Sequence, residues 1–233
     1  MRAIITGATK GIGRAIAEAF AEEGFDLAVC SRTEADLKEM ETAFAKMWPE
    51  SQLLTHAADM RNKEEVLGFG AFVEQHWDNA DVLVNNAGVF IPGQILDEED
   101  GMMELMMETN LYSAYYLTRR LIPLIQAGQR PHLFNICSVA SLMAYPNGGS
   151  YSISKFAMLG FSKVLREELK PEGVRVTSVM PGATWSASWA GVDLPAERLM
   201  PARDIAAAVL NAWQMSAATV VEEILLRPQL GDL

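Results

Sequence analysis

The sequence predicts an α/β fold of three layers, in which helices cover both faces of a seven-stranded parallel sheet. Short apolar runs alternate with longer amphipathic stretches along the 233 residues, a pattern typical of successive β–α–β units. No linker, internal repeat or composition shift divides the chain, so we expect one domain over residues 1–233. A glycine-rich turn directly after the first apolar run favours the doubly wound, Rossmann type of sheet.

Seven apolar runs have the length of strands. In a parallel sheet both faces of a strand are buried, so its strands read as nearly continuous apolar runs. The expected strands are Arg2–Thr6, Asp26–Ser31, Gln52–Ala57, Asp81–Asn85, His132–Ser138, Arg175–Met180 and Val220–Leu226.

Six amphipathic stretches are expected to form helices. They are Ile12–Glu23, Glu34–Met47, Lys63–Trp77, a long helix within Glu98–Gln126, Ser152–Leu169 and Ala202–Met215. The longest stretch without expected regular structure, Ala183–Met200, contains Trp185 and Trp189. Long loops in compact domains are usually functional or mobile, so we expect a substrate loop at residues 183–200. A plain surface connection is the alternative.

Composition narrows the classes of partner. The formal net charge of -11 argues against nucleic acid or an anionic membrane surface. Only Cys30 and Cys137 are present, and no ligand spacing suggests a metal site, so we expect neither disulfides nor a metal. Met1–Ile5 leads straight into the glycine-rich turn, which leaves no room for a signal peptide, and no apolar run approaches the roughly 18 residues of a membrane span. We expect a cytoplasmic protein.

The glycine-rich turn has the context of a dinucleotide site. Residues Thr6–Gly13 read TGATKGIG, so Gly7, Gly11 and Gly13 lie between an apolar strand and an amphipathic helix. Glycines let the backbone approach a pyrophosphate closely, and the helix N-terminus supplies unpaired N–H groups. The spacing is GxxxGxG rather than the GxGxxG of many dehydrogenases.

The end of the second strand indicates which dinucleotide is bound. A fold that prefers NAD usually places an acidic residue there for the ribose 2′-hydroxyl. This chain has Ser31 and Arg32 instead, and Lys10 lies in the glycine-rich turn. Cations in these places would pair with a 2′-phosphate. We therefore predict NADPH rather than NADH; the alternative is two solvated cations beside a helix start.

A tyrosine and a lysine are placed for proton transfer. Tyr151 and Lys155 are four residues apart and so share one face of a helix. The pKa of a free tyrosine is about 10, and the adjacent ammonium, with the cationic oxidised nicotinamide nearby, is expected to lower it. Tyr151 would then give its proton to a carbonyl oxygen as hydride arrives. The pair predicts reduction of a ketone to an alcohol.

Taken together, these motifs resemble the short-chain dehydrogenase/reductase family of the roughly 250-residue type, from end to end. Thr6–Gly13 is similar to the family's TGxxxGxG, residues 85–88 to its NNAG element, and residues 180–182 to the turn after its sixth strand. The residues that match the family's catalytic tetrad are Asn110, Ser138, Tyr151 and Lys155.

The tetrad positions take their expected roles from this resemblance. It implies that Lys155 also binds the nicotinamide ribose and that Ser138 hydrogen-bonds the substrate oxygen. It implies further that Asn110 holds a water behind Lys155, in a proton relay.

The resemblance also implies the cofactor contacts. Asp59 matches the acidic residue that meets the adenine ring, and Ser186 keeps a hydroxyl where relatives usually have threonine. The expected cofactor-binding residues are Gly7, Thr9, Lys10, Gly11, Ile12, Gly13, Ser31, Arg32, Asp59, Met60, Asn86, Ala87, Gly88, Tyr151, Lys155, Pro181, Gly182, Thr184 and Ser186.

Two kinds of family member compete as the nearer resemblance. Residues 219–233 and 189–208 resemble bacterial sepiapterin-reductase-like enzymes, whereas residues 138–155 resemble 3-oxoacyl-acyl-carrier-protein reductases. Carrier-protein reductases commonly have arginines where this chain has Gln129 and Glu172. An acidic protein would also repel an acidic carrier. The carrier reading stays open, because two cations lie close to these positions, namely Arg130 and Lys170.

The expected substrate follows from the side chains near the tetrad. Met143, Tyr145, Trp185 and Trp189 suggest an apolar, partly aromatic pocket that could stack a flat heterocycle. We therefore expect a sepiapterin-like substrate or a small diketone, although the same side chains could close over any ketone. The candidates for a carboxylate that anchors a pterin are Glu222, Glu223 and Asp232.

Two functions of other kinds stay open. A non-catalytic NADPH-binding sensor would keep the fold, but it would not need the intact tetrad. An NAD-dependent alcohol dehydrogenase working oxidatively would not need Lys10 and Arg32. In relatives, the helices that hold Asn110 and Tyr151 pack against another subunit, so the resemblance implies a homo-oligomer, either a tetramer or a dimer.

Overall fold

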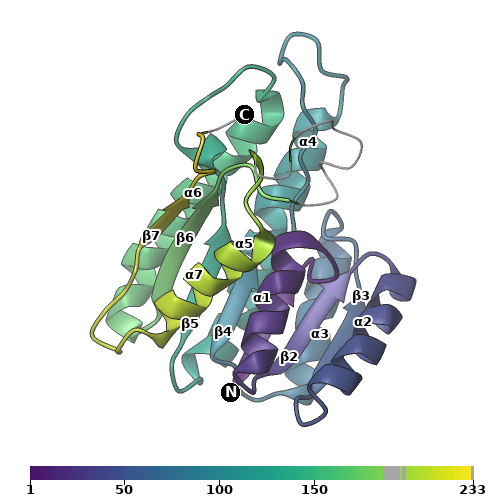
Figure 1. Ribbon diagram of the computed structural model, residues 1–233, viewed down its shortest axis with the longest axis vertical. Coiled ribbons are helices and arrows are strands. Elements are labelled where there is room, and N and C mark those ends of the chain that lie inside the picture. Colours follow the sequence, from purple (N-terminus) through teal and green to yellow (C-terminus); the bar gives the residue numbers. More distant parts are fainter. Residues whose placement is uncertain (186–194, 196–197, 232–233) are drawn as a thin grey trace.

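A seven-stranded sheet forms the centre of the computed structural model, which describes residues 1–185, 195 and 198–231 (Figure 1). The strands are β1 (Arg2–Thr6), β2 (Asp26–Ser31), β3 (Leu53–Ala57), β4 (Val82–Asn85), β5 (His132–Ile136), β6 (Arg175–Pro181) and β7 (Glu223–Leu226). They stand in the order β3-β2-β1-β4-β5-β6-β7, and every pairing is parallel. The predicted fold class is confirmed.

Helices cover both faces of the sheet, with α1, α2 and α7 in front and α3, α5 and α6 behind (Figure 1). One buried cluster joins Phe20 of α1 and Val209 of α7 to Ile5 of β1, and the other joins Phe69 of α3 to Ile4. Ile4 and Ile5, which are neighbours in β1, therefore pack on opposite faces of the sheet. The helices are α1 (Gly11–Glu22), α2 (Glu34–Met47), α3 (Lys63–His76), α4 (Met102–Met107), α5 (Ser113–Gln126), α6 (Gly149–Leu169) and α7 (Ala202–Gln214).

Two elements differ clearly from the expected ones. The helix expected within Glu98–Gln126 is α4, a π-helical turn over Glu108–Tyr112, and α5. Apolar periodicity does not reveal this π turn, because its buried residues are the polar Thr109 and Asn110. The last strand begins at Glu223 rather than at Val220, since the Thr177 side chain, not a backbone N–H group, donates to the carbonyl of residue 221.

The strand order places the functional residues at one edge. The chain direction across the sheet reverses between β1 and β4, and ligands of such folds bind at the carboxyl ends of the strands beside this reversal. Gly7 follows β1, Asn86 follows β4 and Ser138 follows β5 closely. Three distant parts of the sequence thus meet at this edge.

The expected substrate loop at residues 183–200 lies mostly outside the described residues. Its two ends meet, because the backbone N–H of Trp185 donates to the carbonyl of Met200 at 2.8 Å. Within the described ranges, no helix is long and apolar enough to cross a membrane.

Candidate active site

The glycine-rich turn lines a cavity of about 820 Å³. Gly7 and Gly11 have φ values of 64° and 57°, in the left-handed region that favours glycine. A Cβ at Gly13 would overlap the Asn86 side-chain nitrogen. That nitrogen donates to the carbonyls of Thr6 (2.8 Å) and Gly7 (3.0 Å), so Asn86 ties the turn to the end of β4.

The first turn of α1 suits an anionic ligand. Lys10 is the N-cap residue, and its side chain accepts no hydrogen bond from the helix. The first N–H groups therefore have no side-chain cap, and the helix dipole favours negative charge at this end. The turn, the open helix start and the size of the cavity fit the pyrophosphate of a dinucleotide.

The two cations predicted to hold a 2′-phosphate differ in their surroundings. Arg32 lines the cavity, and its side chain has no hydrogen bond or ion pair within the described part of the chain. Lys10 instead pairs with Asp36 of α2 at 2.7 Å. Between them, the hydroxyls of Thr9 and Ser31 share a hydrogen bond of 3.0 Å. Sequence reasoning missed Asp36, because an acidic residue in the first turn of a helix is usually explained by the helix dipole.

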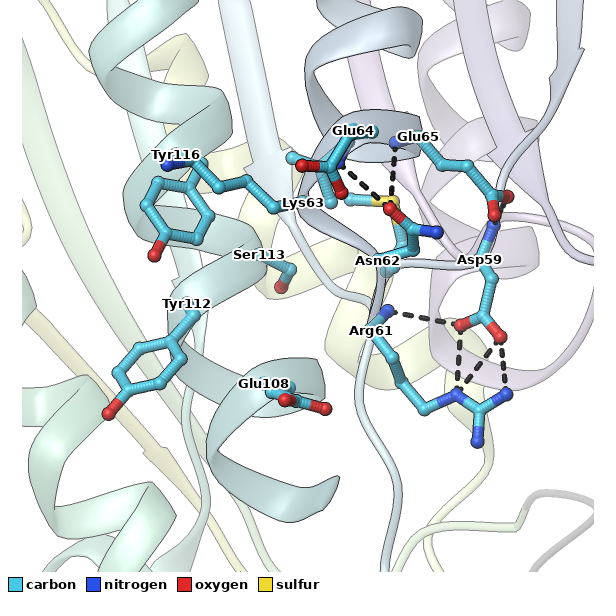
Figure 2. A pocket seen from close by; sticks show the side chains of 12 residues that line it. Asp59, Arg61, Asn62, Lys63, Glu64, Glu65, Glu108, Tyr112, Ser113 and Tyr116 are labelled. Carbon is cyan, nitrogen blue, oxygen red and sulfur yellow. Dashed lines mark hydrogen bonds and ion pairs between the residues drawn. The ribbon is translucent and has the colours of Figure 1, made fainter. Parts of the chain in front are cut away.

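Asp59 is held by a neighbour that sequence reasoning missed. The Arg61 guanidinium folds back on the Asp59 carboxylate, with Nη2 at 2.6 Å from Oδ2 and Nε at 2.9 Å from the same oxygen (Figure 2). This hydrogen bonding is the main reason why the pKa of Asp59 lies below its ordinary value. Asp59 lines the cavity, so an adenine bound beside it would share the Asp59 carboxylate with Arg61.

A second hollow of about 720 Å³ opens beside the Asp59–Arg61 pair (Figure 2). The start of α3 forms one wall, and Glu108, Tyr112 and Tyr116 form the other. None of the four tetrad residues lines it.

Tyr151 and Ser138 line the same cavity as the glycine-rich turn, beyond the end of β5. Ser138 follows β5, and its hydroxyl accepts a hydrogen bond of 3.1 Å from the Ala140 backbone N–H group. The Ser138 hydroxyl also lies close enough to the Tyr151 phenol to lower the pKa of Tyr151. The Phe90 ring meets the Tyr151 ring edge-on, with 4.8 Å between their centroids. These contacts fix the phenol at the wall of the cavity.

The pKa of Tyr151 differs from the expectation. Burial raises it above the ordinary value of 10, and the hydrogen bond with Ser138 offsets only part of the rise. The predicted lowering by Lys155 is wrong for the protein alone. Its ammonium lies 5.8 Å from the centre of the Tyr151 ring and donates to the Ile136 carbonyl at 2.9 Å. Loss of hydration therefore outweighs the neighbouring charge.

Asn110 and Lys155 approach each other at Gly88, which lines the cavity. A Cβ at Gly88 would lie 3.2 Å from Asn110 Oδ1 and 3.5 Å from Lys155 Nζ. Burial lowers the pKa of Lys155. Asn110 Oδ1 accepts from the Val89 N–H group at 2.7 Å, and Nδ2 donates to the Val89 carbonyl and to Ser154 Oγ. The Asn110 side chain thus fastens the π turn to the segment after β4, and its role in a water relay stays a prediction.

The other expected site residues lie together. Apart from Asn110, which lies just behind the wall, and Ser186, which is outside the described residues, every predicted catalytic and cofactor-binding residue lines the main cavity. Met143 and Tyr145 line it as expected. Trp185 is 58% exposed and does not line it, and Trp189 is outside the described residues.

Several lining residues were not singled out from the sequence, among them Asp36, Arg61, Phe90 and Pro92. Phe90 could have been found from its place two residues after the NNAG element, where the chain leaves β4 at the edge of the site.

The candidate pterin anchors do not reach the cavity. Glu222 pairs with Arg166 at 3.0 Å and Glu223 with Lys163 at 2.8 Å, and neither glutamate lines the cavity. Asp232 is outside the described residues. Within the described ranges, no group of three or more His, Cys, Asp or Glu side chains could hold a metal ion. The thiol of Cys137 is buried, which raises its pKa to about 11.

Comparisons with known proteins point in the same direction as this geometry. A family model described as short chain dehydrogenase matches residues 1–194. The chain is 36% identical to the sepiapterin reductase of Chlorobaculum tepidum, over 99% of this chain and 97% of that protein. It is 26% identical to an alcohol dehydrogenase from Thermococcus sibiricus complexed with 5-hydroxy-NADP, with a TM-score of 0.89 and coverage of 98% and 96%. It is 25% identical to the L-sorbose reductase of Gluconobacter frateurii complexed with NADPH and L-sorbose, with a TM-score of 0.88 and coverage of 97% and 95%.

Proposed function

The chain belongs to the short chain dehydrogenase family, and on that premise we propose that it reduces a ketone to an alcohol with NADPH, using Tyr151 as the proton donor. One observation carries the proposal: Ser138, Tyr151 and Lys155 line the same cavity as the glycine-rich turn. Hydride and proton donors can therefore act on one carbonyl group. A sensor would need the turn but not the other three side chains.

The cofactor end of the cavity suits NADPH. When bound, the reduced nicotinamide supplies a hydride. The uncapped start of α1 would hold the pyrophosphate, and Arg32 would meet the 2′-phosphate. Relatives complexed with NADPH or an NADP derivative support this choice. The preference for NADPH also argues against an NAD-dependent alcohol dehydrogenase.

The chain's own groups would supply and hold the proton. The raised pKa keeps the Tyr151 phenol protonated at neutral pH, which is the state that a proton donor needs. Ser138 would hydrogen-bond the same substrate oxygen, because its hydroxyl already contacts the phenol. The Lys155 ammonium has three N–H donors, and its bond to Ile136 uses one. The others are available to the nicotinamide ribose, as the resemblance implies.

A sepiapterin-like substrate or a small diketone fits the substrate end best. Phe90, Met143 and Tyr145 give the cavity an apolar, partly aromatic wall, which favours a flat or compact carbonyl compound. The sepiapterin reductase at 36% identity supports the same choice.

A carrier-protein substrate is the weaker alternative. Arg130 donates to carbonyls at the end of α7 and lies over the Trp213 ring at 4.4 Å, while Lys170 pairs with Glu167. Arg130 and Lys170, the two cations that kept the carrier-protein alternative open, therefore already have partners within the chain. Arg130 also precedes β5, at the edge of the sheet opposite the cavity.

The same proposal covers domain, assembly and location. Residues 1–233 form one cofactor-binding domain whose 183–200 loop contacts the substrate, in a cytoplasmic homotetramer or homodimer. Exposed apolar side chains on α5 and α6 support assembly, since such surfaces are usually covered by a partner. They include Tyr112 before α5, Tyr115, Ile153, Phe156 and Val164.

A panel of substrates tests the proposed chemistry. The purified full chain would be supplied with NADPH and, in turn, sepiapterin, a small diketone and a short 3-oxoacyl thioester. We expect oxidation of NADPH with sepiapterin or the diketone. Turnover of the thioester alone would favour the carrier-protein alternative. Tight binding of NADPH without any turnover would favour a sensor.

A further inference from the structure

A single carboxylate fastens the segment after β4 to the start of the catalytic helix. Glu98 Oε1 accepts a hydrogen bond of 2.9 Å from the Ser150 backbone N–H group, and Oε2 accepts one from the Ser150 hydroxyl. Ser150 is 3% exposed and directly precedes Tyr151. The first turn of α6 is thus tied to a residue that lies 52 positions earlier in the chain.

The backbone reinforces this connection. The Gly93 N–H group donates to the Asn147 carbonyl at 3.0 Å, and Gly93 forms an isolated parallel bridge with Gly148. Gly149 has φ 34°, and a Cβ there would overlap the Glu98 carboxylate. Only glycine at position 149 leaves room for the carboxylate beside the helix start.

The fastened segment also carries part of the substrate wall. Phe90 and Pro92 line the main cavity, and the Phe90 ring packs edge-on against the Tyr151 ring. A wall residue and the proton donor therefore belong to the two pieces of chain that Glu98 joins. The contact between them depends on how those pieces are held.

We propose that Glu98 is a positioning residue, which holds the first turn of α6 against residues 89–98 and so sets the position of the Tyr151 phenol relative to the substrate wall. This inference rests on the proposed ketone reduction. A displacement of about 1 Å at a reacting group can cost about a hundredfold in rate. The effect should appear with the carbonyl substrate rather than in cofactor binding, because Glu98 bonds to Ser150 and not to the glycine-rich turn.

The chemistry explains why a glutamate serves here. Ser150 presents two donors, its N–H and O–H groups, and an ionised carboxylate offers an acceptor oxygen to each. Negative charge is also favoured at the start of a helix. Glutamine at position 98 would keep one acceptor oxygen for the Ser150 N–H group but would place an amide nitrogen, a donor, where Oε2 accepts from the Ser150 hydroxyl. That charge-assisted bond is lost, so Glu98→Gln should have a partial effect.

Steady-state kinetics on full-length variants test the proposal. In Glu98→Ala we expect a lower kcat and a higher KM for the ketone, so that kcat/KM falls by about tenfold or more. The Kd for NADPH, measured by fluorescence, should stay unchanged. Glu99→Ala removes an adjacent exposed carboxylate and should behave as the wild type. A Glu98→Ala variant with unchanged kcat and KM would overturn the proposal, whereas a wild type without turnover would overturn the proposed function instead.

A double-mutant cycle separates positioning from a general loss of stability. Glu98→Gln and Ser150→Ala should each lower kcat/KM partly, and their combination should be no worse than Glu98→Gln alone, because both remove the same hydroxyl bond. Strictly additive losses would contradict the proposal. This cycle decides the question by itself if Glu98→Ala fails to fold.

Hydrogen exchange gives a readout that needs no turnover. In Glu98→Gln we expect faster amide exchange in peptides that cover residues 90–96 and 147–151, and unchanged exchange in α1. Unchanged exchange in the first two regions would show that Glu98 does not hold them together.

Discussion

The ammonium of Lys10 lies 2.7 Å from the carboxylate of Asp36, at the edge of the cofactor cavity. Arg32 lines the same cavity without such a partner in the described part of the chain. The two cations therefore contribute unequally. A cation that already pairs with a carboxylate gains less from a phosphate than one that does not.

Arg32→Ala should weaken NADPH binding far more than Lys10→Ala. A hydrogen bond to a charged group is worth about 1.5–3 kcal/mol, or roughly 10- to 100-fold in Kd. We expect a loss of that size for Arg32→Ala, and a loss of a few-fold at most for Lys10→Ala. NADH binding should change little in either variant. Fluorescence titration measures the Kd of each variant for NADPH and for NADH, with Lys38→Ala on α2 as a control. An unchanged preference for NADPH over NADH in Arg32→Ala would refute the assignment.

The phenol of Tyr151 should ionise only at high pH in the cofactor-free protein. Burial raises its pKa above 10, so the proton-donating form persists as pH rises through neutrality and is lost only above that value. The difference in tyrosinate absorbance between wild type and Tyr151→Phe should therefore appear above pH 10. Tyr145→Phe serves as a control, because burial raises the pKa of Tyr145 to about 12. A difference that appears between pH 7 and 9 would show that Lys155 dominates.

The free energy of unfolding should fall as the solution becomes acidic, because of His132. Burial holds the pKa of this imidazole well below 6.5, and the charges of Arg175 and Arg130 add to the effect. Above pH 6.5 the His132 imidazole is neutral in both the folded and the unfolded protein. Below pH 6.5 the unfolded chain binds a proton at His132, whereas the folded protein does not. This group therefore costs up to about 1.4 kcal/mol for each pH unit below 6.5.

Urea unfolding at several pH values measures this slope. His132→Gln, although less stable at neutral pH, should lose less stability on acidification than the wild type. His76→Gln, which changes an exposed histidine, should keep the wild-type slope. Equal slopes in wild type and His132→Gln would exclude His132 as the cause.

The exposed apolar side chains of α5 and α6 should mediate self-association. Phe156 is 46% exposed and Val164 is 55% exposed. Sedimentation of the wild type should give a dimer or a tetramer, and Phe156→Asp should lower the mass. Met47→Asp changes an exposed side chain at the end of α2 and should leave the mass unchanged. A monomeric wild type would contradict the proposed assembly.

The sequence was sufficient for the features that local chemistry determines. Apolar runs located the strands because both faces of a parallel sheet are buried, and the glycine-rich turn located the end of the cavity. The mutual approach of Ser138 and Tyr151 could be anticipated only from the resemblance to the family's catalytic tetrad.

Features set by packing could not be anticipated. The π turn that holds Asn110 buries two polar residues, Thr109 and Asn110, so apolar periodicity gives no sign of it. The raised pKa of Tyr151 depends on burial, whereas sequence spacing indicated only the nearby Lys155. Glu98 and Ser150 lie 52 residues apart, and neither belongs to a motif. Their contact follows from the path of the segment after β4 and from Gly149.

The most direct test of the account is single-turnover NADPH oxidation by wild type and Tyr151→Phe, with the best ketone from the substrate panel and with the Kd for NADPH measured in parallel. Removing a general acid costs about 10²- to 10⁴-fold. We expect a loss of that size in the rate of NADPH oxidation at saturating NADPH. If Tyr151→Phe oxidised NADPH as fast as the wild type, Tyr151 would not be the proton donor and the central claim would be wrong.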